Sequence, residues 1–407
     1  MAAPVEELPV GLELWTPRVD PAFAVEVERI VAAHVAPVAV AIDRDDVYPR
    51  DVVRALARAG FTAATFPVEL GGGGRRFADL VAIFEAVAAA SAATATSLIT
   101  IFQAGETVHR FGGDALRRRY LPAIADGLLC SFAMTEARHG SDVRHLDTRA
   151  RRDGDAWVLD GRKAFVTSAS AAELFVVLAE TPVGVSAFAI PADTPGASIE
   201  RAPSSSTFGL RNGPHVDLVL DGARVPLDHL VGEEGRGVRV AATTLDHSRV
   251  LAAAIGCGLA RAAFDGALGF ADKRHVSGQY VIELQGIQWY LAELLAEIDG
   301  ARLLTYEAAG HLDAASAAIT DAAPEVRRQA LFDIQRWSSS AKLVATRTAV
   351  RAALQAIQIC GVRGCVESAP FGRYLRDAKT YEIAGGSSEI LKNTLGAYLV
   401  EVVDGPG

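Results

Sequence analysis

The segment Tyr381–Asn393 (YEIAGGSSEILKN) contains the residues whose types and spacing point most directly to a ligand. Gly385 and Gly386 carry no side chain, so the backbone can approach a large flat molecule there. Ser387 can cap the helix that the next apolar residues predict. Glu389 falls in the first turn of that helix, where an acidic side chain suits the helix dipole. The sequence therefore predicts a binding loop that leads into a helix.

The composition indicates a large folded protein and argues against several kinds of partner. Of its 407 residues half are apolar and 22% are charged, which favours extensive burial and more than one subdomain. A formal net charge of −9 argues against nucleic acid, because phosphate binding requires a basic face. The first residues (MAAPVEELPVG) do not form a signal peptide, and we see no charge-free run of membrane length. We therefore expect no membrane partner and a cytoplasmic location.

Cysteine and histidine spacing gives no indication of a metal site. The four cysteines lack a paired-motif spacing, and the nine histidines form no HxxxH or HExxH pattern. We expect the cysteines to be buried free thiols and predict no bound metal.

The hydrophobic periodicity changes twice along the chain. Residues 1–128 predict an all-helical N-terminal domain, and residues 129–235 predict a middle β domain, either a barrel or a sandwich. Asp-Gly pairs at 160–161 and 221–222 predict hairpin turns within it. Residues 236–407 predict a four-helix bundle, because apolar residues recur there at steps of three and four. The expected fold class is therefore α+β.

This layout and four motifs in order resemble the acyl-CoA dehydrogenase family of flavoproteins, from about Ala22 to Val403. The motifs are FAMTEARHGSD (132–142), GRKAFVTSA (161–169), RHVSGQYVIELQGIQ (274–288), and QICGVRGC (358–365) followed by RYLRDAKTYEIAGGSSEI. They are similar to the family's TEPxxGSD, GxKxWITN, RxxFGxPIxxFQxxQ and QxxGGxG…YEGTSEI. The resemblance implies dimers or tetramers that bind FAD between the β domain, the bundle and a neighbouring subunit.

The resemblance assigns cofactor roles to residues of all four motifs. Phe165 stands where the family has a tryptophan over the flavin, and Thr167 is expected near N5. Arg274 and Gln285 are expected at the FAD pyrophosphate of the partner subunit, where a guanidinium suits a pyrophosphate. The remaining residues expected at FAD are Phe132, Met134, Thr135, Ser141, Gln358, Gly361, Ser387 and Glu389.

The resemblance also implies an acyl thioester as substrate. The expected contacts are Ser141, Leu245, Asp246, Arg249, Gly385 and Gly386, with the acyl pocket lined from Thr94–Gln103, which has no charge to pair a dicarboxylate. Asp246 and Arg249 have a second interpretation, because their spacing also allows a plain ion pair within one helix.

The group that does the chemistry is missing from both of the family's usual places. The glutamate of YEGTSEI aligns with Gly385, and the carboxylate that some relatives carry in LDxER aligns with Ser248. Neither residue can act as a carboxylate base, and the loss of a positioned base commonly costs about 10²–10⁴-fold in rate. Asp246 and Glu382 are the nearest acids in sequence, with Glu382 expected at the surface beside Lys379.

Three hypotheses follow. The first is an FAD-dependent dehydrogenase of an acyl thioester, on coenzyme A or an acyl carrier protein, with a relocated base and an electron-acceptor flavoprotein as partner. The second keeps FAD but performs monooxygenation or a redox-neutral β-elimination. The third is a base-less subunit of a hetero-oligomer rather than a homodimer or homotetramer. The acyl chain is not defined by the sequence.

Overall fold

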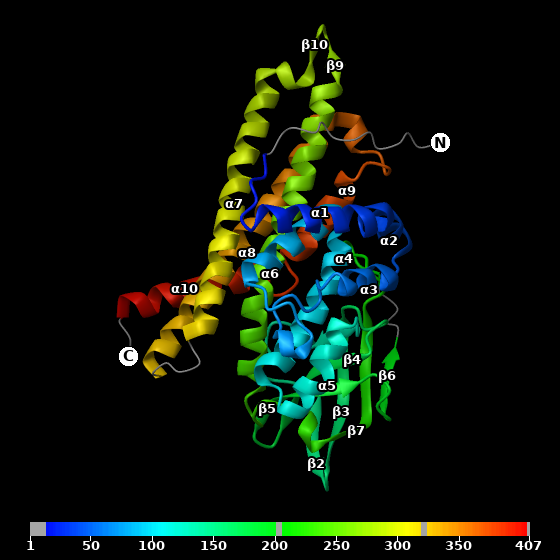
Figure 1. Cartoon of the computed structure of the whole chain (residues 1–407), viewed down its shortest axis with the longest axis vertical. Helices are drawn as coiled ribbons and strands as arrows, with labels where there is room; N and C mark the ends of the chain where they lie inside the picture. Colours follow the sequence, from blue (N-terminus) through cyan, green and yellow to red (C-terminus); the bar gives the residue numbers. More distant parts are fainter. Residues whose placement is uncertain (1–13, 201–205, 319–323, 405–407) are drawn as a thin grey trace.

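The computed structural model describes residues 14–200, 206–318 and 324–404. It consists of a helical N-terminal part, a β-sheet and a C-terminal group of long helices, as predicted (Figure 1). In Figure 1 the strands gather at the lower end of the molecule, and α6 and α7 extend upward to β9 and β10 at the opposite end.

The first N-terminal helix begins where a capping residue and a proline lead one to expect. Asp20 accepts a hydrogen bond from the Phe23 amide at the start of the first helix, with Pro21 at its first position. The elements are α1 (Pro21–His34), η1 (Ala36–Val38), α2 (Ala39–Asp45), α3 (Arg50–Arg58), η2 (Val68–Leu70), α4 (Phe77–Phe111) and α5 (Asp114–Ala125).

One mixed sheet forms the middle part. The order of its strands is β6-β7-β3-β2-β4-β5-β8, and β1 pairs in parallel with β4. A core of buried aromatic residues, Trp157, Phe175 and Phe188, lies on one face. The strands are β1 (Cys130–Ala133), β2 (Arg149–Asp153), β3 (Ala156–Val166), β4 (Leu174–Thr181), β5 (Gly184–Pro191), β6 (Ala197–Glu200), β7 (Val216–Pro226) and β8 (Leu230–Val231), with η3 (Leu227–His229) before β8.

The two predicted Asp-Gly hairpin turns are wrong. Both pairs lie inside long strands, and the register of β3 on β7 shifts where they face each other, between Leu159 and Gly161. The Gly222 amide donates to the Asp160 carboxylate at 2.8 Å. A Cβ at Gly161 would meet Thr148 Cα at 2.6 Å, so this glycine permits a close backbone approach. The Asp-Gly pairs therefore form a bulge, and residues 154–155 make the turn instead.

Long helices form the C-terminal part, with one more helix, α9, than the sequence predicted. Leu291, Leu294 and Ile298 are buried along one face of α7, as their spacing predicts. The elements are α6 (Gly237–Lys273), β9 (His275–Val276), β10 (Gln279–Tyr280), η4 (Val281–Glu283), α7 (Gln285–Ala318), α8 (Pro324–Cys360), η5 (Gly361–Gly364), α9 (Phe371–Tyr381) and α10 (Ser388–Asp404).

Close packing joins α6 to α4 of the N-terminal part and to α8 of its own part through glycine. A Cβ at Gly258 would lie 2.2 Å from the Glu85 carbonyl oxygen on α4, and one at Gly256 would lie 2.9 Å from the Ala345 backbone on α8. The expectation of no charge-free run of membrane length is wrong, because residues 86–105 in α4 carry no charged side chain. By length and composition α4 and α6 could each cross a membrane, but 78% of the apolar window of each is buried in the structure, as in core helices. Three of the cysteines are buried as expected, whereas Cys365 is exposed.

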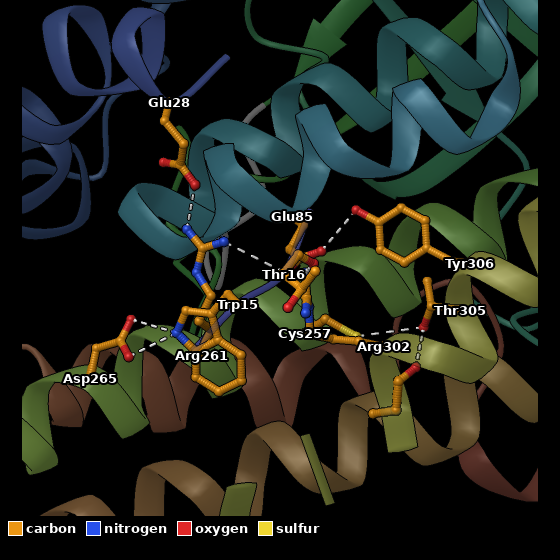
Figure 2. Close-up of polar contacts among 11 residues, drawn as sticks. Trp15, Thr16, Glu28, Glu85, Cys257, Arg261, Asp265, Arg302, Thr305 and Tyr306 are labelled. Atoms are coloured by element: carbon orange, nitrogen blue, oxygen red, sulfur yellow. Dashed lines mark hydrogen bonds and ion pairs between the residues drawn. The ribbon is translucent and has the colours of Figure 1, made fainter. Parts of the chain in front are cut away.

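A buried polar network fastens α4 to α6 and α7 (Figure 2). The Glu85 carboxylate accepts hydrogen bonds from Arg302 Nε at 2.7 Å and from the Tyr306 hydroxyl at 3.0 Å, and Arg261 lies 3.6 Å away. Glu85 and Arg302 are almost completely buried, so each charge depends on the other for compensation.

We predict that Glu85→Ala lowers the free energy of unfolding by about 3–5 kcal/mol, because it leaves the Arg302 guanidinium buried without its counter-ion. The matched control is Glu297→Ala, which removes one of the two carboxylates that pair with the exposed Arg351, leaving Glu293, and is expected to change stability by less than about 1 kcal/mol. Urea denaturation of the three proteins measures both values. Equal effects of the two substitutions would contradict the structural role of this network.

Candidate active site

A buried ion pair holds the first two motifs together. Glu136 follows β1 and Lys163 lies in β3, and their carboxylate and ammonium groups are 2.7 Å apart with both side chains almost fully buried. The Glu136 carboxylate also accepts the amides of Asp147 and Thr148, and the Ala164 amide donates to the Thr135 carbonyl. Burial raises the pKa of Glu136, but these hydrogen bonds outweigh it and hold the pKa at about 2.

Two adjoining cavities lie where the sheet meets the bundle. The larger, of about 480 Å³, is lined by residues 134–143, by α6 and by the loop before α10. The smaller, of about 130 Å³, lies between α4, β1, α6 and the end of α9. Ala384 and Gly385 line both cavities, so the two spaces meet at the glycine pair that the sequence singled out.

Residues of the first two motifs surround these cavities. Met134, Thr135 and Ser141 line the larger cavity, whereas Phe132 and Thr167 line the smaller one. The Thr167 hydroxyl lies 3.0 Å from His215 Nε2.

Backbone strain is concentrated around the same site. Phe165 has φ of 53° and remains 57% exposed, and Ser168 and Leu210 also have positive φ. Such conformations cost about 1–3 kcal/mol each and tend to occur at functional sites. Phe165 lines neither cavity, but its uncovered aromatic ring offers the flat apolar surface that a flavin ring requires. Thr135 and Thr167 line the larger and the smaller cavity and offer hydroxyl donors.

The charged residues of α6 line the larger cavity. Asp246 pairs with Arg249 at 2.8 Å, so the ion pair within one helix is formed. Arg249 Nε is buried and has no hydrogen-bond partner among the described residues. Burial raises the pKa of Asp246 to about 6 against the attraction of Arg249. The unpartnered nitrogen leaves a donor available to a ligand.

Lys342 on α8 holds the backbone of the glycine loop, residues 384–386, in place. Its ammonium group donates to the carbonyls of Ala384 and Gly386, each at 2.5 Å. Burial lowers the pKa of Lys342 to about 7, and the nearby Arg249 charge acts in the same direction. Gly385 itself has φ of +67°, a conformation that a residue with a side chain rarely adopts.

Neither of the two expected base positions holds an acid. Gly385 and Ser248 both line the smaller cavity, where the Ser248 hydroxyl donates to the Leu245 carbonyl and accepts from Gln103 Nε2. None of the described residues lining this cavity carries a carboxylate. Glu382 pairs with Lys379 at 2.5 Å as expected, but its side chain is only 15% exposed, so the expected surface position is wrong.

The structure does not bring every predicted cofactor residue to these cavities. Leu245, Gly386 and Ser387 line the larger one. Glu389 is exposed in the first turn of α10 and lines neither cavity. Arg274, Gln285, Gln358 and Gly361 also line neither, and they stand where α6 and α8 end and α7 begins, toward the end of the molecule that bears β9 and β10 (Figure 1). Their roles at FAD stay predictions.

Sequence reasoning missed two polar residues of the site. His215 lines the smaller cavity, and Lys342 supports the glycine loop. Gln103 also lines the smaller cavity, within the segment expected there. A lysine in the apolar run AKLVA was the available signal for Lys342, since a lone lysine among small apolar residues must find buried partners. No spacing rule pointed to His215, because its hydrogen-bond partner is 48 residues away in the chain.

Fold and site together define a flavoprotein built from an α domain, a sheet and a helical bundle, and the comparisons with known proteins give the family. The chain matches the acyl-CoA dehydrogenase N-terminal domain over residues 20–128, the middle domain over residues 131–223 and the C-terminal domain over residues 235–400. It therefore belongs to the acyl-CoA dehydrogenase family. The protein is a flavoenzyme of that type, with FAD as its cofactor.

Individual relatives support this assignment. The chain is 32% identical to the short-chain specific acyl-CoA dehydrogenase, mitochondrial, of Rattus norvegicus, with 89% of this chain and 86% of that protein covered. It is 29% identical to the probable acyl-CoA dehydrogenase FadE25 of Mycobacterium tuberculosis, with 89% and 91% covered. Its structure is similar to butyryl-CoA dehydrogenase from Megasphaera elsdenii, with a TM-score of 0.85, 28% identity, and 93% and 97% of the two chains covered.

We predict that Lys163→Met lowers the free energy of unfolding by about 3–5 kcal/mol and reduces FAD retained per chain, because Glu136 is left buried without its cation. In the double variant Glu136→Gln/Lys163→Met both charges are gone, and the glutamine oxygen still accepts one of the two backbone amides, which donate to different carboxylate oxygens in the natural protein. The free energy of unfolding of this double variant should fall clearly less than that of Lys163→Met. Urea denaturation and the flavin absorbance of the purified proteins measure these effects, and equal losses would contradict the ion-pair account.

The same pair predicts an acid dependence of stability. Because the pKa of Glu136 falls from 4.5 to about 2 on folding, the unfolded chain takes up the proton first. The stability from this group is therefore present above pH 4.5 and lost as the pH falls toward 2. The difference in unfolding free energy between the natural protein and Glu136→Gln should narrow below pH 4.5 in urea titrations. A constant difference would contradict the assignment.

Proposed function

We propose that this protein removes hydrogen from the α and β carbons of an acyl thioester, with a proton acceptor other than the family's carboxylate. The observation that carries the proposal is the pair of cavities joined at Gly385. The larger one offers the Asp246–Arg249 pair and a free guanidinium nitrogen, which suit a pantetheine arm. The smaller one suits the acyl group. When bound, FAD supplies the two-electron acceptor, while the chain's residues bind the thioester and take up the proton.

The acyl group is proposed to be short and uncharged at its far end. A cavity of about 130 Å³ holds about four water molecules, hence only a few carbon atoms. No lysine or arginine lines it among the described residues, so a second carboxylate would find no cation. Side chains of Thr96, Thr100 and Tyr381 add polar surface, which favours an acyl group that itself carries a polar atom.

A second candidate follows from the missing carboxylate at Gly385 and Ser248. An enzyme of this family without its base is suited to monooxygenation or to redox-neutral elimination of a β-substituent, and a partner chain could supply the base in a hetero-oligomer. In each case the thioester occupies the same cavities, but the change in the flavin spectrum differs.

The partners are proposed from the same features. We infer a homodimer or homotetramer, because Arg274 and Gln285 line neither cavity and so suit the FAD of a neighbouring copy. An electron-acceptor flavoprotein is the proposed oxidant, and either coenzyme A or a carrier protein is the proposed acyl donor. A cytoplasmic location is proposed with them.

An anaerobic titration of the yellow protein with short acyl thioesters tests the proposed function. A dehydrogenase bleaches the flavin absorbance and releases an unsaturated thioester. Product without bleaching indicates elimination, and consumption of oxygen by the reduced protein indicates oxygenation. A colourless folded protein that takes up no FAD would contradict the proposal.

Substitution of Arg249 tests whether its side chain binds the thioester. We predict that Arg249→Gln weakens thioester binding by about 10- to 100-fold, because a charge-assisted hydrogen bond is lost, while FAD is retained. Arg239→Gln is the matched control, because Arg239 is exposed on the same helix and lines neither cavity. Unchanged thioester affinity in Arg249→Gln would remove this residue from the binding site.

A further inference from the structure

The hydroxyl groups that line the smaller cavity use their protons within the protein. Thr96 and Thr380 donate to the carbonyls of Ala92 and Arg376 in the preceding helical turn, each at 2.8 Å. Threonines in helices commonly bond to the backbone in this way. A hydroxyl whose one proton is used elsewhere offers a ligand only its lone pairs, so these two side chains present hydrogen-bond acceptors.

Thr100 and Ser248 line the same cavity and have no spare proton either. The Thr100 hydroxyl lies 2.9 Å from the Ser97 carbonyl and 3.1 Å from the Ser168 hydroxyl, and it is the donor in either contact. The Ser248 hydroxyl donates to the Leu245 carbonyl at 3.1 Å. A ligand in the cavity therefore receives no proton from these two hydroxyls.

Tyr381 presents an acceptor for a related reason. Its hydroxyl lies 2.8 Å from Thr96 Oγ1. Because the single proton of Thr96 is directed to the Ala92 carbonyl, the tyrosine is the donor of this bond. Burial raises the pKa of Tyr381, so the phenol keeps its proton. The lone pairs of the phenol oxygen are left for a ligand.

His215 adds another acceptor just before β7. Its Nε2 atom lies 3.0 Å from the Thr167 hydroxyl, and Nδ1 is buried without a hydrogen-bond partner among the described residues. Burial lowers the pKa of His215, against a smaller effect of Asp46, so the ring is neutral near pH 7. Thr167 is expected to donate its own proton to FAD, so its oxygen accepts from Nε2–H. The lone pair of the neutral ring is then at Nδ1.

The cavity has no charged wall to bind an ion. Among the described residues that line it there is no carboxylate, lysine or arginine, so a buried ammonium or carboxylate of a ligand would find no counter-ion. Gln103 is the one described lining side chain with a spare proton, because one of its two amide protons is directed to Ser248. The wall therefore offers mainly neutral acceptors, and a plain alkyl chain would leave them unpaired.

We propose that the acyl group of the substrate carries an uncharged hydrogen-bond donor, a hydroxyl or an N–H group, which His215 Nδ1 and the Tyr381 hydroxyl oxygen accept. The assignment rests on the proposed function, since it requires an acyl thioester in this cavity. A cavity of about 130 Å³ holds only a few non-hydrogen atoms, so the donor lies within a few bonds of the thioester carbonyl. His215 and Tyr381 are then residues that determine specificity.

The test measures binding alone. The FAD-loaded protein is reduced beforehand without oxygen, so that no substrate is oxidised, and is titrated calorimetrically with thioesters of coenzyme A and of pantetheine. Butyryl is compared with 3-hydroxypropionyl, and pentanoyl with 4-hydroxybutyryl, because a methyl and a hydroxyl group are similar in size. We expect the hydroxylated member of at least one pair to bind about 10- to 100-fold more tightly, since its partner leaves buried acceptors unpaired. The 4-fluorobutyryl thioester cannot donate and should bind like pentanoyl.

Substitutions in the cavity separate recognition of the donor from a structural role. Tyr381→Phe and His215→Leu should each bring the ratio of the two affinities within a pair close to one. The conservative His215→Asn keeps an acceptor oxygen near the position of Nδ1 and should retain part of the preference. Tyr290→Phe is the control for loss of a phenol hydroxyl, because Tyr290 is exposed on α7. Flavin absorbance and thermal unfolding verify that each variant is folded and loaded.

The possible failures can be told apart. Equal affinities within both pairs, or a 4-fluorobutyryl thioester that binds as tightly as the 4-hydroxybutyryl one, overturn the inference while leaving the proposed function in place. A preference that is unchanged in Tyr381→Phe or in His215→Leu also overturns it. If no thioester binds the loaded protein or perturbs its flavin spectrum, the proposed function itself fails and the assignment falls with it.

Discussion

The site depends on the buried contact between Lys163 and Glu136. One residue comes from the strand that carries Phe165, and the other comes from the segment that carries Thr135. Because both charges are removed from water, neither segment can move away without exposing an uncompensated ion. The backbones of Phe165 and Thr135 are therefore fixed relative to each other before any ligand arrives, which is the preorganisation that a flat cofactor requires.

The remaining walls of the site come from all three parts of the chain. Asp377 in α9 accepts the Leu210 amide at 2.7 Å, and Arg376 pairs with Asp43 in α2. Leu210 lies in the loop before β7 and borders the smaller cavity. The α9 helix therefore holds this loop in place through Asp377, and Arg376 ties α9 to α2. Lys342 holds the opposite wall through the carbonyls of the glycine loop. The cavities thus exist only where sheet, bundle and N-terminal helices meet.

The sequence predicted the order of the three parts and the segments that line the site, because helical and strand periodicities and four motifs are local signals. It did not predict features that depend on distant pairs. The Asp-Gly pair at 160–161 was predicted to form a turn, because such pairs occur both in turns and in bulges. The pairing of β3 with β7 determines that it forms a bulge. Glu85, His215 and Lys342 escaped notice for the same reason, as each gains its meaning from a residue far along the chain.

A flavin site without a carboxylate at either family position is the central claim of this account. Gly385 and Ser248 border a cavity in which none of the described lining residues carries a carboxylate. A crystal structure of the assembled protein with FAD and an unreactive acyl thioester analogue tests this most directly. We predict that the α carbon lies beside Gly385, with no carboxylate of any subunit within hydrogen-bond reach. A carboxylate found at that distance, from this chain or a neighbouring one, would contradict the account.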